Sequence, residues 1–412
     1  MPQHDNGAMP PLLSQTGAFK DARDLIPADA LIPYDLNVSF WSDGAMKSRW
    51  MALPNDSSSK PQKIGFIPTG EWNFPEGTVF VKHFDMVMDE TRPEIKRRLE
   101  TRLLMRDGTG GVYGVTYKWR PDNSDADLLG TNLTETLLIK TAGGTRTQTW
   151  YYPNRQDCMT CHTPRAGGVL GLKTRQLNHD LKFPNGVTDN ELRAWNHIGL
   201  FKPELKEADV PGYAKLARAD DASRSIEDRA RSYLDANCAQ CHRPGGTVAY
   251  FDARYDTPLG HQDLIEGQVL INQGIDNAQI IAPNDIWRSI LYMRMSTVDS
   301  IKMPPLAHEV RDEQSAELLR NWITGMPGPP VLAPPTISPH GGEYAKGVEV
   351  TLTTTESGAS IHYTLDGSTP TKSDALYDKP IKISGPTTLR VKAYKPGFTK
   401  SITAQETFIV GE

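Results

Sequence analysis

The sequence predicts a multidomain chain with a β-rich N-terminal domain, an all-α middle domain and a small C-terminal β-sandwich. Its 412 residues are enough for about two to four domains. Hydrophobic residues make up 38% and charged residues 23% of the chain, a composition typical of folded proteins. The spacing of apolar residues changes twice along the chain, from alternating to helical near residue 222 and back to alternating after residue 340.

The N-terminal domain, predicted over residues 1–205, consists mostly of strands and turns. Its apolar residues alternate with polar ones in several runs, and Gly-rich segments at 106–111 and 143–144 predict the turns of two hairpins. Strands are expected over 76–84, 98–105, 112–119, 135–140 and 145–152.

The middle domain, residues 206–327, is predicted to be all-α with three principal helices. Ser225 precedes the first helix as an N-cap, and acidic residues occupy its first turn. The helices are expected over 225–236, 284–293 and 311–323.

A Pro-rich linker and a small β-sandwich are predicted after the middle domain. Six prolines fall within residues 326–339, which predicts a stiff, extended linker over 328–339. Alternating runs beyond it predict the strands of a sandwich over 340–412.

The four cysteines form two pairs, each with two residues between its members and a histidine directly after it. The first motif is Cys158, Cys161 and His162, and the second motif is Cys238, Cys241 and His242. Cys-x-x-Cys-His is the attachment signature of c-type haem, in which two thiols bond to the vinyl groups and the histidine ligates the iron. The sequence therefore predicts two covalently attached haems, whose irons are ligated by the two motif histidines.

Other uses of paired cysteines stay open at this point. A Cys₄ zinc site would use the same four thiols, but it needs no histidine after each pair. A thioredoxin-like redox pair also has the spacing Cys-x-x-Cys, but it lies in a βαβ setting that neither motif shows.

Residues 222–327 combine an opening helix, the second motif, Met303-Pro-Pro and a closing helix with Leu-Leu-x-x-Trp322-Ile. On these features there is a resemblance to a class I-type cytochrome c domain. It implies that Met303 is the sixth ligand of the second iron, and that Tyr233 and Trp322 join the first and last helices. The alternative is that Met303 is an ordinary core methionine. The next candidates for the ligand are Met293 and Met295.

The sixth ligand of the first iron is assigned to His179, which follows His162 by 17 residues after a Gly-rich segment. The alternatives are another histidine, a methionine, or an open or water-bound site. The side chains considered are His83, Met86, Met88 and Met105.

Four segments of the N-terminal body are distinctive: Asp35–Asp43, Leu99–Leu104, Tyr117–Asp122 and the first motif leading to Leu172–Asn178. In these segments the body resembles an uncharacterised family of bacterial secreted dihaem proteins. Members of this family are often fused to sugar-dehydrogenase-like or carbohydrate-binding modules. The resemblance therefore implies a carbohydrate-associated setting but no established activity.

Three segments of residues 340–412 are distinctive: Tyr363–Pro370, Leu376-Tyr377 and Leu389–Phe398. In these segments the chain resembles the C-terminal module of chitobiases and hexosaminidases, a small immunoglobulin-like β-sandwich. A sugar-binding platform would present exposed aromatic side chains, typically Trp, and this stretch has no Trp. The module is therefore expected to be a spacer or a protein-docking piece, with weak polysaccharide binding as the alternative.

These features predict a dihaem c-type cytochrome that transfers electrons between a redox protein partner and an acceptor, without a catalytic role of its own. A carbohydrate-oxidising enzyme is one expected partner. An iron with both axial positions filled passes electrons and binds no substrate. The alternative is a haem oxidoreductase or peroxidase-like enzyme that uses the first haem as its reactive site.

Charge and hydropathy limit the setting further. The 45 basic and 50 acidic residues leave a net charge of −5, so the basic excess of a nucleic-acid-binding protein is missing. No apolar run is long enough for a transmembrane helix. Haem attachment to cysteines outside the cytoplasm predicts a periplasmic or secreted protein, and a signal peptide is expected to be absent from this chain.

Overall fold

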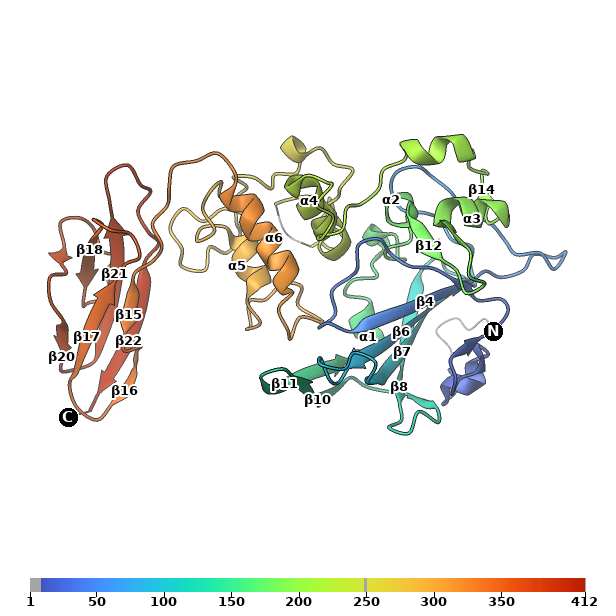
Figure 1. Cartoon of the computed structure of the whole chain (residues 1–412), viewed down its shortest axis with the longest axis horizontal. Helices are drawn as coiled ribbons and strands as arrows, with labels where there is room; N and C mark the ends of the chain where they lie inside the picture. The colour runs from blue at the N-terminus through green and yellow to red at the C-terminus, as the bar shows by residue number, and fades with distance from the viewer. Residues whose placement is uncertain (1–8, 248–249, 412) are drawn as a thin grey trace. The chain divides into compact units, whose positions relative to one another are not determined.

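A computed structural model describes residues 9–247 and 250–411 (Figure 1). These residues form two compact units, which are described separately. The first unit holds the described residues within Met1–Val248, Asp252–Pro258 and Met295–Leu318. The second unit holds those within Ala249–Phe251, Leu259–Arg294 and Leu319–Glu412.

The regular elements are short and mostly strands. The strands up to residue 202 are β1 (Phe19–Asp21), β2 (Ile26–Pro27), β3 (Ile32–Pro33), β4 (Met46–Ala52), β5 (Ile64–Gly65), β6 (Val79–Val87), β7 (Lys96–Arg106), β8 (Val112–Trp119), β9 (Ala126–Leu128), β10 (Leu133–Thr141), β11 (Gly144–Tyr152), β12 (Asp180–Lys182), β13 (Thr188–Asn190) and β14 (Phe201–Lys202). The helices are α1 (Arg155–Cys158), α2 (Thr174–Leu177), α3 (Glu191–His197), α4 (Ile226–Asn237), α5 (Ile290–Ser296) and α6 (Glu313–Thr324), with 3-10 helices η1 (Leu13–Thr16), η2 (Pro164–Ala166), η3 (Glu207–Gly212) and η4 (Leu259–His261). The later strands are β15 (Thr336–Ser338), β16 (Gly342–Tyr344), β17 (Val348–Thr353), β18 (Ser360–Thr364), β19 (Ala375–Leu376), β20 (Ile381–Ile383), β21 (Thr387–Tyr394) and β22 (Ala404–Val410).

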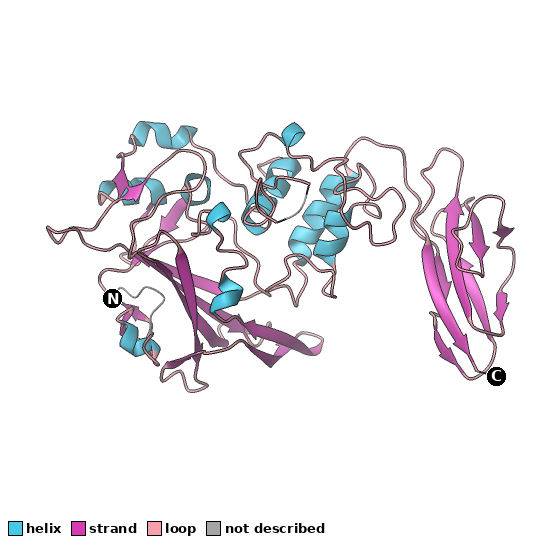
Figure 2. Ribbon diagram, turned by 180° about the vertical axis from the view of Figure 1, so that it is seen from behind, coloured by secondary structure: helices cyan, strands magenta, loops and turns pink. Residues whose placement is uncertain are grey.

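A six-stranded antiparallel sheet is the main layer of the first unit (Figure 2). Its strand order is β3-β4-β6-β7-β8-β9. Residues directly opposite one another on paired strands point to the same face of the sheet. The register therefore defines rows of side chains across β4, β6, β7 and β8. On one face, three successive rows are Met51-Phe80-Leu104-Gly114, Arg49-Lys82-Arg102-Thr116 and Lys47-Phe84-Glu100-Lys118.

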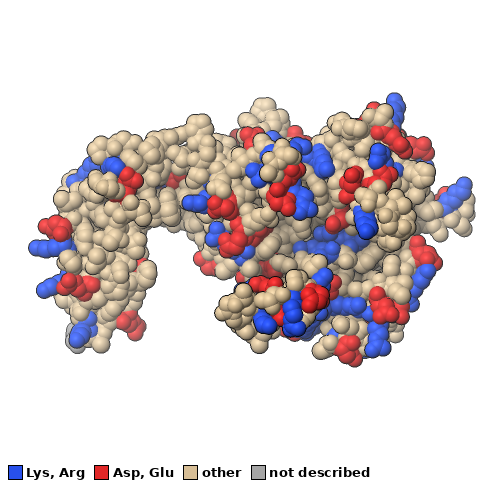
Figure 3. Space-filling model, in the orientation of Figure 1, with Lys and Arg blue, Asp and Glu red and all other residues tan. Residues whose placement is uncertain are grey.

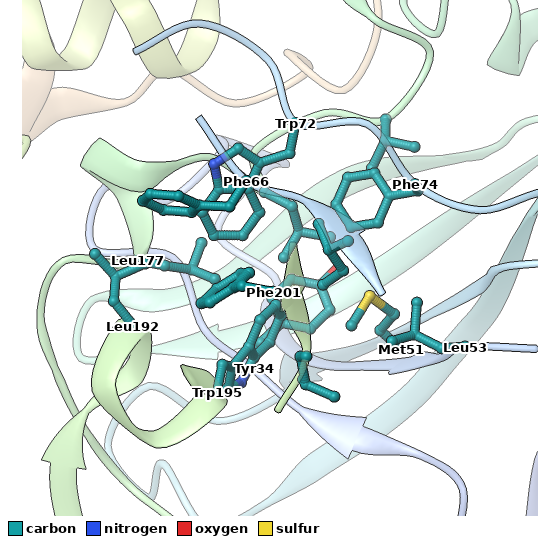
Figure 4. Close-up of a cluster of buried hydrophobic side chains, with 14 of the residues drawn as sticks. Tyr34, Met51, Leu53, Phe66, Trp72, Phe74, Leu177, Leu192, Trp195 and Phe201 are labelled. Carbon is teal, nitrogen blue, oxygen red and sulfur yellow. The ribbon is translucent and has the colours of Figure 1, made fainter. Parts of the chain in front are cut away.

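Hydrophobic clusters cover both ends of that face. Met51 and Phe80 belong to a cluster that also contains Trp72 and Phe201. The ring centroids of Trp72 and Phe201 lie 5.1 Å apart. Figure 4 shows Met51, Trp72 and Phe201 in this cluster. A second cluster joins Phe84 to residues of the β10–β11 hairpin. The middle row, which carries three basic residues, therefore lies between two apolar clusters.

Two sheets share one core in the C-terminal part of the second unit. One sheet has the order β15-β17-β20 and the other β16-β22-β21-β18-β19. Inward-facing residues such as Val350, Ile383, Val391 and Phe408 are almost fully buried in a common cluster. Their positions follow the alternation of apolar and polar residues along each strand.

An ion-pair network joins this sandwich to an earlier segment of the same unit. Lys392 of β21 is 1% exposed, and its Nζ lies 3.0 Å from Asp276 Oδ2. Arg288 donates to the backbone oxygens of Lys400 and Ser401 at 3.1 and 3.3 Å. The sandwich is therefore held by buried polar contacts as well as by its own core.

The prediction of an all-α middle domain is wrong, and with it the predicted fold class. The chain is β-rich, with 31% strand against 15% helix. Within residues 206–327 the α-helices are α4, α5 and α6, of 12, 7 and 12 residues. The described residues between α4 and α5 form turns, isolated bridges and η4, because this stretch is rich in Gly, Pro and Asn.

The helix expected over 284–293 also begins later, at Ile290. The Asp285 carboxylate accepts hydrogen bonds from the backbone nitrogens of Trp287 and Arg288 at 3.0 and 3.1 Å. The Ser289 hydroxyl donates to Asp285 O at 2.6 Å. These local bonds compete with the helical pattern and hold the preceding residues in turns.

Among the described residues, no helix combines the length and the apolar character that crossing a membrane requires.

Candidate haem sites

The two Cys-x-x-Cys-His motifs adopt the same backbone turn. In the first motif, the nitrogens of Cys161 and His162 donate to Cys158 O at 3.3 and 3.0 Å. The corresponding bonds of the second motif, from Cys241 and His242 to Cys238 O, are 3.1 and 2.9 Å long. Each turn places two thiols and one imidazole on a short segment, as attachment of one haem requires.

The first unit brings the two motifs together, although 80 residues separate them in sequence. The Cys241 Sγ lies 3.9 Å from Thr160 O, within the first motif. The thiols of Cys161 and Cys241 also interact: hydrogen bonding to Cys161 lowers the pKa of Cys241 to about 6, and the same contact raises the pKa of Cys161. All four cysteines are free thiols.

The imidazole of His162 is held in an orientation that suits iron ligation. Its Nδ1 lies 2.7 Å from Gly168 O, so the Nδ1–H donates to that carbonyl and Nε2 is left as the ligating atom. Burial lowers the pKa of His162 to about 4, so the ring is neutral. A neutral imidazole with its second nitrogen fixed by a carbonyl is the form that binds iron.

Gly114 on β8 provides the space for the first motif to lie on the sheet. A Cβ at this position would lie 2.7 Å from Cys158 Sγ and 3.0 Å from Cys158 Cβ. Helix α1 begins at a capping box, in which the Asn154 side chain accepts from Asp157 N and the Asp157 carboxylate accepts from Asn154 N. This cap ends β11 and positions Cys158 against Gly114.

A cavity of about 200 Å³ opens between the first motif and the face of the sheet. Its walls include Cys158, Cys161 and His162, the sheet residues Phe80, Lys82, Arg102, Leu104 and Gly114, and Pro304, Leu306 and Ala307 from the segment after Met303. Cavities for larger organic ligands usually measure roughly 300–1,000 Å³. A porphyrin is larger than this cavity, so the cavity would have to widen to hold one. The wall segment 304–307 lies outside helices and strands.

Three basic residues face one another in the middle row of the sheet. Arg49 pairs directly across from Lys82, and Lys82 pairs directly across from Arg102. Like charges directly opposite each other destabilise a sheet. Arg102 is compensated by a two-pronged ion pair with Glu100, at 3.0 and 2.6 Å. Arg49 forms an ion pair with Asp35 through one of its terminal nitrogens.

Two features of this row are left uncompensated within the described residues. Arg49 is 5% exposed, and its Nε and second terminal nitrogen have no hydrogen-bond partner. Lys82 contacts the rings of Phe40 and Phe84, at 5.5 and 5.0 Å from their centroids, but no carboxylate lies within ion-pair distance of it. Burial, and then the neighbouring cations, hold the pKa of Lys82 well below its ordinary value.

The second motif is anchored through the helix that precedes it. Asp235 of α4 is 2% exposed and pairs with Lys173 and Arg175, at 3.1 and 2.9 Å. Lys173 and Arg175 lie just after the first motif in sequence and flank the start of α2. Arg243, which follows the second motif, donates to Arg165 O at 3.1 Å. The segments around the two motifs are therefore bonded to one another by buried charges.

The segment that carries Met303 is attached to the N-terminal body of the first unit. The Asp43 carboxylate accepts hydrogen bonds from the backbone nitrogens of Glu309 and Val310 at 2.6 and 2.9 Å. The Trp41 Nε1–H donates to Val310 O at 2.9 Å. Met303 itself is half-buried, and its ligation of the second iron stays a prediction. The contact predicted between Tyr233 and Trp322 also stays a prediction.

The candidates for the sixth ligand of the first iron lie outside this cavity. His179 has its Nε2 3.0 Å from the buried Glu191 carboxylate, and it is not a wall residue. His83 is fully buried on the opposite face of the sheet, with its Nδ1 2.8 Å from Thr101 Oγ1. Met86 and Met105 pack in hydrophobic clusters. His179 as the ligand therefore stays a prediction that rests on sequence.

The sequence analysis missed the basic residues of the middle row and Gly114. A usable signal was present, because Lys82 stands within the apolar run Val79-Phe-Val-Lys-His-Phe84. A lysine at an inward-facing position of a strand indicates either an ion pair or a bound anion. The alignment with Arg49 and Arg102 depends on strand pairing and carries no local sequence signature.

The donor set of each motif is the one that covalent haem uses. Among the described residues, no group of three or more His, Cys, Asp or Glu side chains is placed to hold a metal ion, as a Cys₄ zinc site requires. A c-type haem needs only two thiols and one imidazole from each motif. The orphaned nitrogens of Arg49 and the apolar walls of the cavity also suit a porphyrin, which is apolar with two carboxylates.

Residues 339–405 match the family described as chitobiase/beta-hexosaminidase C-terminal domain. The match confirms the resemblance drawn for the C-terminal module and is limited to the sandwich. A search of curated proteins found no match to the chain. The resemblance of the remaining residues to dihaem cytochromes stays a prediction.

Proposed function

We propose that this protein is a dihaem c-type cytochrome that moves electrons between a redox protein partner and an acceptor, in the periplasm or outside the cell. The observation that carries the proposal is the meeting of the two Cys-x-x-Cys-His motifs in one compact unit, with Cys241 Sγ 3.9 Å from Thr160 O. Two redox groups attached to adjoining segments can exchange electrons directly. A carbohydrate-oxidising enzyme is the proposed donor, on the strength of the family resemblance and the C-terminal module.

The chain's own residues would hold each haem in a fixed place. Each motif supplies two thiols and an axial imidazole, and a bound haem supplies reversible one-electron oxidation of its iron. Gly168 O fixes the His162 ring, while Gly114 leaves room for Cys158 on the sheet. The ion pairs of Asp235 with Lys173 and Arg175 bond the second motif's helix to the segment after the first.

The surface does not favour nucleic acid as a partner. Figure 3 shows basic and acidic side chains interspersed over the visible face, with no continuous basic stripe. This distribution agrees with the net charge of −5. A protein partner with its own mixed surface is the proposed docking target.

A second candidate function is haem-based catalysis at the first site. Among the residues that line its cavity, His162 is the only histidine and no methionine is present. A haem with one axial protein ligand offers its other position to a substrate. Lys82 and Arg102 are wall residues that would hold an anionic substrate there, and Lys82 is the one of the two that can donate a proton.

A potentiometric titration of the visible spectrum separates the two functions. An electron-transfer protein is expected to show two low-spin haems with distinct potentials and no response to cyanide. A high-spin component in the oxidised spectrum, together with cyanide binding, would favour catalysis at the first haem. A mature protein without covalent haem by mass spectrometry would refute both.

A further inference from the structure

The middle row of the sheet presents more positive charge than its protein neighbours compensate. Arg49, Lys82 and Arg102 share one face on three adjacent strands. Asp35 and Glu100 supply two carboxylates to these three cations. Like charges directly opposite one another destabilise a sheet, and a bound anion would offset that cost.

The donors of this row that have free hydrogen-bonding capacity border the cavity. Arg49 and Lys82 both line it, and two nitrogens of Arg49 are buried without a partner. An unpaired buried donor costs about 1–3 kcal/mol, and more when it is charged.

The distance between the basic row and Cys158 of the first motif is comparable to the width of a haem. Cys158 sits over Gly114 of β8, whereas Lys82 is on β6 and Arg49 on β4. Neighbouring strands are about 4.8 Å apart, so these cations stand roughly 10–14 Å across the sheet from the cysteine. In haem, the vinyl groups that bond to cysteine and the two propionates lie on opposite edges of the ring.

We infer that Arg49 and Lys82, supported by Arg102, form the binding site for the propionate carboxylates of the first haem. The inference rests on the proposed function, since it requires a haem on the first motif. Arg49 contributes two nitrogen donors and Lys82 one ammonium group, while Glu100 keeps Arg102 in place. The uncompensated cation also raises the potential of this haem, because oxidation of the iron adds positive charge beside it.

The test measures the potential of each haem in matched variants. Lys82→Gln removes the unpaired charge, Lys82→Arg keeps it, and Lys118→Gln removes a lysine of the neighbouring row that is paired with Glu135 at 3.0 Å. We expect Lys82→Gln to shift the reduction equilibrium of the first haem about tenfold toward the oxidised form, which is about 59 mV for one electron. In Lys82→Gln the potential of the second haem should stay at its wild-type value. In Lys82→Arg and Lys118→Gln the potentials of both haems should stay at their wild-type values.

Haem counting keeps this inference distinct from the proposed function. A wild-type protein without covalent haem refutes the proposed function, whereas wild-type potentials in a two-haem Lys82→Gln protein overturn the propionate site alone. If Lys82→Gln does not mature, Arg49→Lys is used, which keeps the charge but removes the unpaired nitrogens. It should shift the propionate bending mode in the resonance Raman spectrum, and an unchanged mode would overturn the inference.

A free carboxylate is the competing source of the anion. Sodium propionate added to the two-haem protein should leave both potentials and the thermal unfolding temperature unchanged, because the haem propionates already occupy the row. Stabilisation by added propionate that disappears in Lys82→Gln would assign the row to a diffusible anion and overturn the inference.

Discussion

The two Cys-x-x-Cys-His motifs have the same local structure and different surroundings. Both close their turns with hydrogen bonds from the second cysteine and the histidine to the carbonyl of the first cysteine. The first motif begins at the last residue of the four-residue helix α1 and lies on a β-sheet at Gly114. The second follows the twelve-residue helix α4, which is held by buried ion pairs of Asp235.

This difference shows that the motif sets only the local geometry of its two thiols and its imidazole. The surrounding fold sets the charges and packing around each motif. The first site has a row of three cations with two carboxylate partners beside it, whereas Asp235 near the second site is neutralised by two cations. We therefore expect the two haems to have different potentials. Such a difference would give electron transfer between them a direction.

The largest expected effect is on the number of covalently bound haems, when the cysteines of one motif are replaced. Replacing both cysteines of the second motif, Cys238→Ala with Cys241→Ala, should leave one covalent haem, and replacing both cysteines of the first motif should leave the other. Each single-haem protein should retain the spectrum of its remaining haem. Mass spectrometry after acid-acetone extraction counts the haems. Loss of both haems from either double variant would show that the two sites mature only together.

Substitution of Met303 tests which site it serves. The resemblance to cytochromes c predicts that Met303→Ala abolishes the weak sulfur-to-iron band and lowers the potential of the second haem, because a thioether favours ferrous iron. We expect a change of at least about tenfold in the reduction equilibrium, or about 59 mV. The measurement is made in the single-haem backgrounds. Unchanged potentials in both would make Met303 a packing residue and direct the search to Met293 and Met295.

Removal of the buried charge at Asp235 should destabilise the first unit. Asp235→Asn leaves Lys173 and Arg175 without their common carboxylate, and breaking a buried pair costs about 3–5 kcal/mol. Asp220→Asn is the control, because Asp220 pairs with Arg218 at the surface and should cost less than about 1 kcal/mol. Urea unfolding measures both. Equal effects would show that the Asp235 cluster is not a stabilising contact.

The same carboxylate gives a pH dependence with a definite sign. Burial alone would raise the pKa of Asp235, but Lys173 and Arg175 hold it well below its ordinary value. Its contribution is therefore complete above the unfolded-state pKa of about 3.9 and is lost as the pH falls below that value toward the folded-state pKa. The difference in unfolding free energy between wild type and Asp235→Asn should be constant above about pH 5 and should shrink in more acidic urea titrations.

The smallest expected effect concerns the C-terminal module. Cleavage within 328–339 should leave both haem spectra unchanged, because both motifs lie in the first unit and the module in the second. The linker itself is held, since Leu332 N donates to Thr399 O at 3.0 Å and Thr399 N donates to Pro330 O at 2.8 Å. We therefore expect slow proteolysis there, which should accelerate in Asp276→Ala, where Lys392 loses its carboxylate. A spectral change on cleavage would contradict the independence of the module.

Local sequence patterns were sufficient for several features of this protein. The Cys-x-x-Cys-His turns close within five residues, and β6, β7 and β8 follow from runs rich in apolar residues and bounded by turn residues. The resemblance of the C-terminal module rests on segments within the matched residues 339–405. The helical patterns around 225–236 and 311–323 also have helices at their positions, α4 and α6. The segment is nevertheless not a helical domain. Helices at its two ends do not determine the structure of the residues between them, which form turns and isolated bridges.

Tertiary structure alone decided the rest of the candidate site. The alignment of Arg49, Lys82 and Arg102 depends on the pairing register of three strands, and a shift of one residue would have turned them to the other face. Cys241 contacts the first motif, and an ion pair between Arg175 and Asp235, 60 positions apart, joins the segments that carry the two motifs. Such long-range contacts result from the packing free energy of the whole unit, which no short window of sequence contains.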